Sequence, residues 1–469
     1  MGSPIEKESA RFMTNDQWLR AIEKYDSDDF SRSFDHPERG GALELARMLQ
    51  EFTQEQPMRF AQLALQIPEE SHHYYFSHVI RGLADSTIPS VDKLKVIRRV
   101  LDSDSKDCIQ AALNLISSLK DVELPDDVTQ FIQRMAEHSD PIAESWNGER
   151  PYYGGDILTH GINCVRGNVA ETIRSLLFYD ETNLTIFAPT IEKLVSDPSL
   201  AVRACAASTL IAVTNLDFEK ALQWGDVLLS ADERLLATTY VQKFIIRGLP
   251  DYFKRFESVI HKMLCAEHEK VRTAGGTIAC LARLYHTEAD YLSEKALKGD
   301  EYCRLGACEV AKSNLLNIDC REWCEFALRR LFDDDDKKVR QNAAGCFWNL
   351  WQSPDTPLKE FDELIDCFLK SASFTEEPTF LLHAFEENNH QLPDIVIDIC
   401  SFFIERCGEE AKDIRTSMAA DEMTVGKLVF TAYAQLQSLS GQNKALDLID
   451  QMSIEGLSSA KTHLTEFER

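Results

Sequence analysis

Three histidines lie close together near residue 72, beside two glutamates, and both residue types can bind metals. His72, His73 and His78 follow Glu69 and Glu70. A zinc site needs three or four ligands that converge, and a helix supplies them at spacings of three or four residues. The three histidines are one, five and six residues apart, so they do not share one helix face. We interpret them as surface histidines and predict no metal site here.

Other arrangements that could support catalysis or cofactor binding are incomplete. Gly426-Lys427 lacks the glycine that a phosphate-binding loop carries five residues earlier, and neither serine nor threonine follows the lysine. Cys320 and Cys324 could share a helix face, but no paired histidine lies nearby to complete a zinc site. The 13 cysteines contain no Cys-x-x-Cys pair and are typical of buried free thiols in a reducing cytoplasm. The sequence therefore predicts a cytoplasmic protein with no catalytic residues, no cofactor and no metal.

The densest mixture of aromatic and polar side chains lies between residues 146 and 166. Two prolines, three glycines and three aromatic residues interrupt the helical pattern at 139–160, which predicts an ordered loop. Aromatic residues and arginine are frequent anchors of protein interfaces. Alternatively, the loop packs its rings onto the rest of the chain, because large aromatic side chains favour burial. The candidate partner-binding residues are Trp146, Arg150, Tyr152, Tyr153, His160, Asn163 and Arg166.

A repeated Val-Arg pair marks the helices that must position this stretch. The pair begins at Val165, Val202, Val271 and Val339, in steps of 37, 69 and 68 residues. Aligning Leu235 and Cys303 with the two missing positions gives steps of 37, 33, 36, 32 and 36 residues. A period in this range predicts a stack of helical hairpins.

The repeated arginine has a structural role available to it. Asp197 lies six residues before Arg203, and Asp334 lies six residues before Arg340. Such pairs could hydrogen-bond within or between neighbouring turns and form a ladder, with a gap before Arg272, where alanine holds the equivalent position. The alternative is that these arginines line a ligand groove. A small residue four places after the valine position should let helices approach closely, as at Ala206, Gly275, Ala307 and Ala343.

Composition limits the partners that this chain can have. Fifty Lys and Arg residues stand against 77 Asp and Glu residues, a net charge of −27, which repels a nucleic-acid backbone. The same surface could simply be solvated, or it could bind a basic protein. No apolar run approaches membrane-spanning length, so we expect no membrane association. Glycine and proline are sparse, at 20 and 15 among 469 residues, which favours a mostly helical chain.

These patterns together predict an all-α solenoid of HEAT-like helical hairpins, curved along its length. Residues 1–138 should form irregular repeats, and 139–160 a loop that joins two parts of the chain. Residues 161–353 should form the regular repeats, and 354–469 the helices that cap the stack.

Several segments resemble the C-terminal helical region of large bacterial multidomain NTPases of the STAND type, a class that includes antiviral defence sensors. They are Met13–Arg20, Gly40–Ala46, Pro57–Phe60, Gly155–Gly167, Asp197–Cys205, Asp413–Thr416 and Ala445–Asp450. The resemblance implies that an effector and a P-loop NTPase precede this region and that the region itself is a sensor. Met1-Gly2-Ser3 suggests an engineered start, which agrees with a fragment of a longer protein.

We therefore expect a non-catalytic recognition module that binds a protein along its concave face. The expected partner is a phage protein or the NTPase portion of the same system. One alternative is a scaffold that binds its own NTPase portion constitutively. A second alternative is an enzyme on a helical-repeat frame, such as a base-excision glycosylase. That enzyme would need a basic, aromatic-lined groove, which the net charge of −27 argues against.

Overall fold

The computed structural model describes residues 2–27, 40–120, 122–142, 152–388, 390, 392–460 and 462. The regular elements in these ranges are all helices, which confirms the predicted all-α class. The chain divides into two compact units, residues 1–247 and residues 248–469, and we describe each unit by itself. Among the described residues, every helix is too short or too polar to cross a bilayer.

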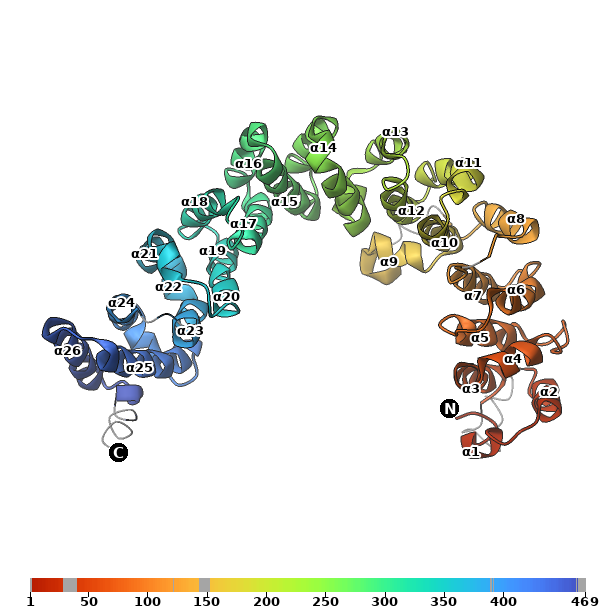
Figure 1. The fold of residues 1–469 in the computed structure, drawn as a ribbon, viewed down its shortest axis with the longest axis horizontal. Coiled ribbons are helices and arrows are strands. Elements are labelled where there is room, and N and C mark those ends of the chain that lie inside the picture. The colour runs from red at the N-terminus through yellow and green to blue at the C-terminus, as the bar shows by residue number, and fades with distance from the viewer. Residues whose placement is uncertain are drawn as a thin grey trace. The chain divides into compact units, whose positions relative to one another are not determined.

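Unit 1 consists of paired helices that follow one another along the chain (Figure 1). Its helices are α1 (Lys7–Ala10), α2 (Asn15–Lys24), α3 (Ala42–Glu55), α4 (Pro57–Ala64), α5 (His73–Leu83), α6 (Ser90–Ile97), α7 (Lys106–Ile116), α8 (Asp126–Met135), α9 (Ile157–Ile162), α10 (Val165–Tyr179), α11 (Asn183–Val195), α12 (Leu200–Val213) and α13 (Phe218–Leu229). Helix α14 (Thr239–Leu264) begins in unit 1, and its residues from Gly248 onward belong to unit 2. It contains Pro250 and is kinked at Tyr252.

Unit 2 continues with paired helices. They are α15 (Glu269–Tyr285), α16 (Asp290–Leu297), α17 (Glu301–Asn314), α18 (Arg321–Leu331), α19 (Lys337–Ala344), α20 (Cys346–Trp351), α21 (Asp362–Lys370), α22 (Ala372–Glu376), α23 (Thr379–Glu387), α24 (Pro393–Ala411), α25 (Ser417–Gln435) and α26 (Leu439–Glu455). Short 3₁₀ turns connect some of the helices, namely η2 (Arg98–Val100), η4 (Tyr152–Gly155) and η5 (Glu233–Ala237) in unit 1, and η6 (Thr287–Ala289) and η7 (Leu358–Phe361) in unit 2.

The helices of each unit form two rows. Row B holds the helices that pack on one another in succession: α3, α5, α7, α10 and α12 in unit 1, and α15, α17, α19 with α20, α23 and α25 in unit 2. Row A holds their partners: α4, α6, α8, α11 and α13 in unit 1, and α16, α18, α21, α24 and α26 in unit 2. This two-row stacking of hairpins is the solenoid that the repeat predicted.

Side-chain capping fixes where the helices begin. Thr14 and Gln17 form a capping box at the start of α2, with Thr14 N donating to Gln17 Oε1 at 2.7 Å. Asp300 Oδ1 accepts the backbone N–H of Cys303 at 3.0 Å at the start of α17. The valine position is the third residue of its helix in α12, α15, α17 and α19, which confirms the alignment of Cys303 with the Val-Arg repeat. The aligned Leu235 lies instead in the 3₁₀ turn η5.

Small residues allow the close approach that the sequence predicted, and α15 and α17 show it most clearly. A Cβ atom on Gly276 would collide with the backbone oxygen of Cys303, and one on Gly306 would collide with that of Thr273. Gly275, in the predicted small-residue position, faces the backbone of Met263 and Leu264 at the end of α14. The two row B helices therefore pack backbone against backbone.

The two compact units do not follow the predicted boundaries. Their division at 247 and 248 falls inside the predicted regular repeats, 161–353. The four predicted ranges describe regularity of sequence rather than compactness, and they stay a prediction. Helix α9 begins at Ile157, within the stretch that was predicted to be a loop, because the Asp156 side chain accepts the N–H of Thr159 at 2.6 Å and caps the helix.

Candidate functional site

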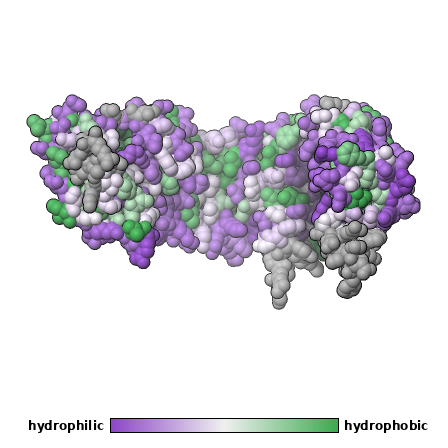
Figure 2. Space-filling model, turned by 90° about the horizontal axis from the view of Figure 1, so that it is seen from below, coloured by the Kyte–Doolittle hydropathy of each residue, from purple (hydrophilic) through white to green (hydrophobic). Residues whose placement is uncertain are grey.

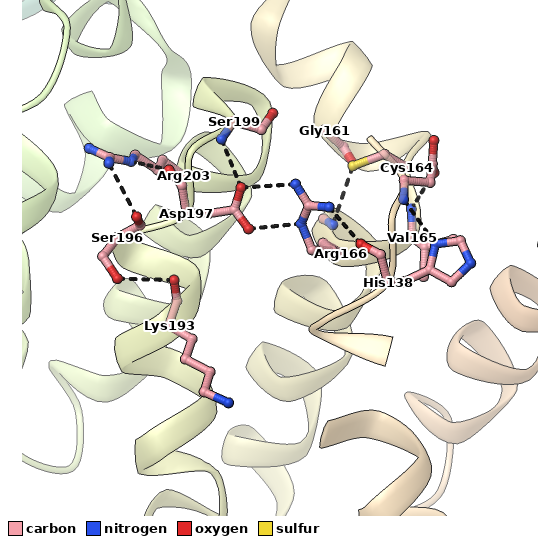
Figure 3. Close-up of polar contacts among 12 residues, drawn as sticks. His138, Gly161, Cys164, Val165, Arg166, Lys193, Ser196, Asp197, Ser199 and Arg203 are labelled. Atoms are coloured by element: carbon pink, nitrogen blue, oxygen red, sulfur yellow. Dashed lines mark hydrogen bonds and ion pairs between the residues drawn. The ribbon is translucent and has the colours of Figure 1, made fainter. Parts of the chain in front are cut away.

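The segment between His138 and Val165 is an insertion in one helical hairpin of unit 1. Arg166 of α10 donates from Nη1 to the backbone oxygen of His138, just after α8, at 2.6 Å (Figure 3). It also donates from Nε and Nη2 to the two carboxylate oxygens of Asp197, at 2.8 and 3.1 Å. The Arg166 and Asp197 side chains are only 10% and 7% exposed. The hairpin of α8 and α10 thus closes as the regular ones do, although a long segment separates its helices.

A second set of contacts fixes the same junction. Asp140 Oδ2 accepts the backbone N–H of Val165 at 2.8 Å and lies 3.0 Å from Lys106 Nζ. The Asp140 backbone oxygen accepts the N–H of Arg166. The start of the inserted segment therefore caps the helix that follows its end, which holds both ends of the segment together.

Helix α9 of the insertion covers part of row B. It packs on α12, and a Cβ atom on Gly161 would collide with the backbone oxygen of Ala201 and the sulfur of Cys205. Helix α12 is buried on nearly every side, with only Leu200, Arg203 and Ile211 outside the buried class. A helix that is apolar all round must be covered on all its faces. The insertion supplies that cover for α12.

The predicted partner-binding residues lie in different environments. Trp146 and Arg150 lie outside the described residues, and of Tyr152 the structure describes only the backbone, in η4. Tyr153 is 52% exposed, with a φ of 54°, and its ring centroid lies 6.2 Å from that of the buried His160. Asn163 is exposed and donates to the Thr159 backbone oxygen at 2.8 Å. A partner-binding role for these residues stays a prediction, and Arg166 has the structural contacts described above.

The repeated arginines form the predicted ladder, but their partner atoms differ from those predicted. Arg203 donates to the backbone oxygen of Asp197 rather than to its carboxylate, at 2.5 Å (Figure 3). Arg340 likewise donates to the Asp334 backbone oxygen at 2.6 Å. The predicted gap at Arg272 is wrong, because its partner is the backbone oxygen of Ala266, at 2.8 Å, and a carbonyl is present whatever the side chain.

The carboxylates of the ladder belong to the next repeat along the chain. The pairs are Arg166 with Asp197, Arg272 with Asp300, Arg304 with Asp334, and Arg340 with Glu376. Arg304 follows the aligned Cys303 and occupies the arginine position of a copy without a Val-Arg pair. Each of these arginines therefore joins its own turn to the next hairpin. Among its described contacts, Arg203 reaches only backbone oxygens, at Ser196 and Asp197.

An exposed aromatic surface lies on row B of unit 2, and we call Trp348, Trp351, Phe380 and His383 the aromatic surface. Trp348 is 44% exposed, and its ring lies edge-on to those of Trp351 and Phe380, with centroids 4.8 and 5.5 Å away. Trp351 stacks on His383 with centroids 4.8 Å apart. One face of the molecule in Figure 2 is mostly hydrophilic with separate hydrophobic areas. Large rings that stay partly exposed at a protein surface are candidates for contact with a partner.

Charged groups beside the aromatic surface are paired. His383 Nδ1 lies 3.1 Å from Glu386 Oε2, and Lys427 Nζ lies 2.6 Å from Glu386 Oε1. Burial raises the pKa of Glu386, but hydrogen bonds from Lys427 and His383 outweigh it and lower that pKa overall. Beneath them Asp421 is buried and accepts a hydrogen bond from Thr379, and burial raises its pKa to about 6. The aromatic surface therefore rests on a fixed polar network.

The aromatic surface was not predicted from the sequence, because apolar stripes mark only the buried face of each helix. Phe347 and Leu350 belong to the buried stripe of α20, whereas Trp348 lies one residue off it. A tryptophan off the buried face of an amphipathic helix is the signal that could have found it. Its neighbours Phe380 and His383 come from a different helix, α23, and no sequence spacing joins them to α20.

The described residues include the metal-ligand types near residue 72. They contain no group of three or more His, Cys, Asp or Glu side chains that could hold a metal ion. His78 is buried and donates from Nδ1 to the Tyr74 backbone oxygen at 3.0 Å, and burial lowers its pKa. The histidine-rich stretch near residue 72 is thus partly core, not all surface as predicted.

Comparisons with known proteins give one distant structural likeness. No family model matches the chain, and no curated protein matches it. Among solved structures, it is similar to a chain from a structure described as that of the Pds5–Scc1 complex, with implications for cohesin function. The two are 13% identical, the match covers 96% of this chain and 80% of that chain, and the TM-score is 0.35. We build no functional argument on a likeness at this level. The resemblance to multidomain NTPases stays a prediction.

Proposed function

We propose that the chain is a non-catalytic protein-recognition module and that its binding surface includes the aromatic surface of unit 2. The observation that carries this proposal is the exposure of Trp348 on a row B helix, packed against Trp351 and Phe380. Tryptophan is among the residues that contribute most to protein interfaces. A solenoid presents such residues on a continuous surface, built from neighbouring repeats.

Contacts within the aromatic surface hold its rings in place and favour tight binding. Trp351 is stacked on His383, and His383 is paired with Glu386, and both contacts restrain the rings. Asn349 Nδ2 donates to the Lys312 backbone oxygen at 2.7 Å and joins α20 to α17. Ordering such groups before a partner arrives reduces the entropy lost on binding. The paired charges around the rings suit a partner that presents an apolar side chain flanked by both signs of charge.

The finer part of the proposal is a sensor role within a bacterial signalling NTPase, supported by the segments that resemble such proteins. In that role the partner is a trigger protein, such as a phage protein, or the NTPase portion of the same system. A scaffold is the second candidate, because the ladder arginines build a stack that could simply organise a complex.

Replacing Trp348 and Phe380 together by alanine tests the proposal. The chain is immobilised and exposed to the NTPase portion and to lysate from phage-infected cells, and the affinity for each captured protein is then measured. Loss of two ring contacts should weaken binding about 30-fold or more. A sensor should bind its trigger only from infected lysate, whereas a scaffold should bind the NTPase portion with or without infection.

Phe326→Ala is the matched control. Phe326 is also 44% exposed and lies in unit 2, but it belongs to α18 of row A. It should leave binding unchanged within about twofold, the usual result for a residue outside an interface. Equal binding by the double variant and the unchanged chain would reject the aromatic surface as the recognition site.

A further inference from the structure

A groove in unit 2 lies between the end of α15, helix α16 and the start of α18. It encloses about 450 Å³, within the roughly 300–1,000 Å³ of pockets that bind ligands. None of the residues of the aromatic surface lines it. The charged side chains that line it are Arg283, Asp290, Glu294, Asp319 and Glu322. Four carboxylates against one cation make the groove negative at neutral pH.

Two of the four carboxylates are paired and two are not. Asp290 pairs with Arg283 at 2.8 Å, and Glu294 pairs with a lysine and an arginine that do not line the groove. Asp319 and Glu322 are exposed and form no ion pair within the described part of the chain. They stand just before α18 and in its first turn. The dipole of a helix favours acidic residues at its start, so these two residues alone do not indicate a ligand.

Trp323 supplies a separate observation. It lines the groove from the first turn of α18 and is only 8% exposed. Its indole N–H donates to no atom among the described residues, yet it is not fully enclosed, as the N–H of Trp18 is. The small open part of this side chain therefore includes the N–H, which faces the groove. A tryptophan N–H in a largely buried ring usually has an acceptor. The helix dipole does not account for this donor, and an acceptor on a ligand does.

The two observations together define the chemistry of the ligand. The free carboxylates call for a cation, and the indole N–H calls for an acceptor. A metal ion or a polyamine carries no acceptor, and a nucleic acid would bring phosphates against Asp319 and Glu322. A lysine in an extended polypeptide carries both groups, an ammonium on a flexible stem and a backbone carbonyl beside it. The net charge of −27 also attracts a basic partner.

We propose that this groove binds a lysine-bearing extended segment of a protein partner. Asp319 and Glu322 hold the ammonium, and a backbone carbonyl of the segment accepts the hydrogen bond from Trp323 Nε1. The apolar stem of the lysine lies along the groove between these two contacts. The site does not depend on the aromatic surface, and it adds a second contact of different chemistry to unit 2.

The test uses a fluorescent short peptide of alternating lysine and alanine, whose anisotropy is followed as the full chain is added. Salt at about 0.15 M screens charges beyond about 8 Å. The unchanged chain should bind this peptide, and the same peptide with acetylated lysines should not bind. Asp319→Asn with Glu322→Gln should weaken binding about 3- to 30-fold, because two exposed ion pairs are lost. Trp323→Phe keeps a ring but removes the N–H, which should weaken binding about 2- to 10-fold.

Asp398→Asn with Glu405→Gln is the matched control. Both residues are exposed on the row A helix α24, outside the groove, and neither forms an ion pair within the residues that the structure describes. This double variant removes the same charge and should bind the peptide within about twofold of the unchanged chain. A loss as large as that of the groove variant would show attraction to the overall charge and would overturn the site.

The remaining outcomes separate this site from simpler ones. Equal binding of the acetylated peptide would exclude an ammonium ligand, and equal binding by Trp323→Phe and the unchanged chain would leave a simple cation site and overturn the polypeptide. The alanine double variant of Trp348 and Phe380 should bind the peptide normally. Phe326 also lines the groove, so Phe326→Ala should weaken the peptide but not the partner of the aromatic surface. Circular dichroism of each variant shows that weaker binding is not a folding defect.

Discussion

Part of row B in unit 1 is covered by α9, whereas Trp348 of row B in unit 2 stays exposed, and the two places carry different residues. Helix α9 of the insertion lies on α12, whose covered side offers small residues such as Ala201 and Cys205. On α20 and α23 of unit 2, the described residues form an aromatic surface with Trp348 44% exposed. A face that its own chain covers needs small residues for close packing, whereas an uncovered face can keep large rings for a partner. The comparison supports the aromatic surface as the recognition site.

Breaking the ion pair between Arg166 and Asp197, at the junction that holds the insertion, should have the largest effect on stability. Arg166→Ala leaves the nearly buried Asp197 carboxylate without its cation, which should cost about 3–5 kcal/mol of unfolding free energy. Arg340→Ala, where the paired side chains are 16% and 19% exposed, should cost less, about 1–2 kcal/mol. Chemical denaturation of both variants measures the difference. Equal costs would show that the Arg166–Asp197 pair contributes no more to stability than the more exposed Arg340–Glu376 pair.

Separating α9 from α12 should have an intermediate effect. Gly161→Ala places a methyl group against the Ala201 backbone oxygen, which should cost about 1–3 kcal/mol and expose α12. Hydrogen exchange of α12 amides reports this exposure directly. The control is Gly345→Ala, at the open junction of α19 and α20, where the nearest atom to the added Cβ is the Asn342 oxygen at 3.0 Å. An unchanged exchange rate in Gly161→Ala would mean that α9 does not protect α12.

The smallest expected effect is a dependence of folding stability on pH, which comes from the buried Asp421 near the aromatic surface. Burial raises the pKa of Asp421 to about 6, so the folded chain holds this proton more tightly than the unfolded chain. The resulting contribution favours folding at pH values below the unfolded pKa and is lost as pH rises through about 6. Asp421→Asn should therefore be more stable than the unchanged chain at pH 7, by about 1–2 kcal/mol. Urea denaturation at pH 4 and 7 should show this advantage shrinking at pH 4, and an advantage equal at both values would exclude Asp421 as its source.

The sequence predicted those features of the fold that depend on one repeat at a time. The Val-Arg period predicted the hairpins, and the alignment of Cys303 located Arg304 in the ladder. The partner atoms were predicted wrongly, because an arginine that reaches Asp or Glu of the next repeat crosses an interface that sequence spacing does not show. The aromatic surface was not predicted for the same reason, because Trp348 and Phe380 come together only when α20 packs on α23.

The same limit applies to the contacts of Lys295 with His261 and Cys265. His261 and Cys265 have helical spacing, but Lys295 comes from the next row A helix. Periodicity identifies which side of a helix is buried, and it does not say which neighbouring helix supplies the facing residue. The candidate residues of the insertion were found from composition, which located the exceptional segment but not the way it docks.

The hairpin of α8 and α10 keeps its closing contacts although a long segment separates the two helices. Arg166 still reaches the His138 oxygen and Asp197, and Asp140 still caps Val165. The length of chain between these anchors is therefore independent of the register of the stack. Exchanging only residues 143–151 for an unrelated segment, with α9 kept on α12, should give solenoids with the same core and different attached structures, so this turn is a natural acceptor site for grafted binding loops or reporter domains.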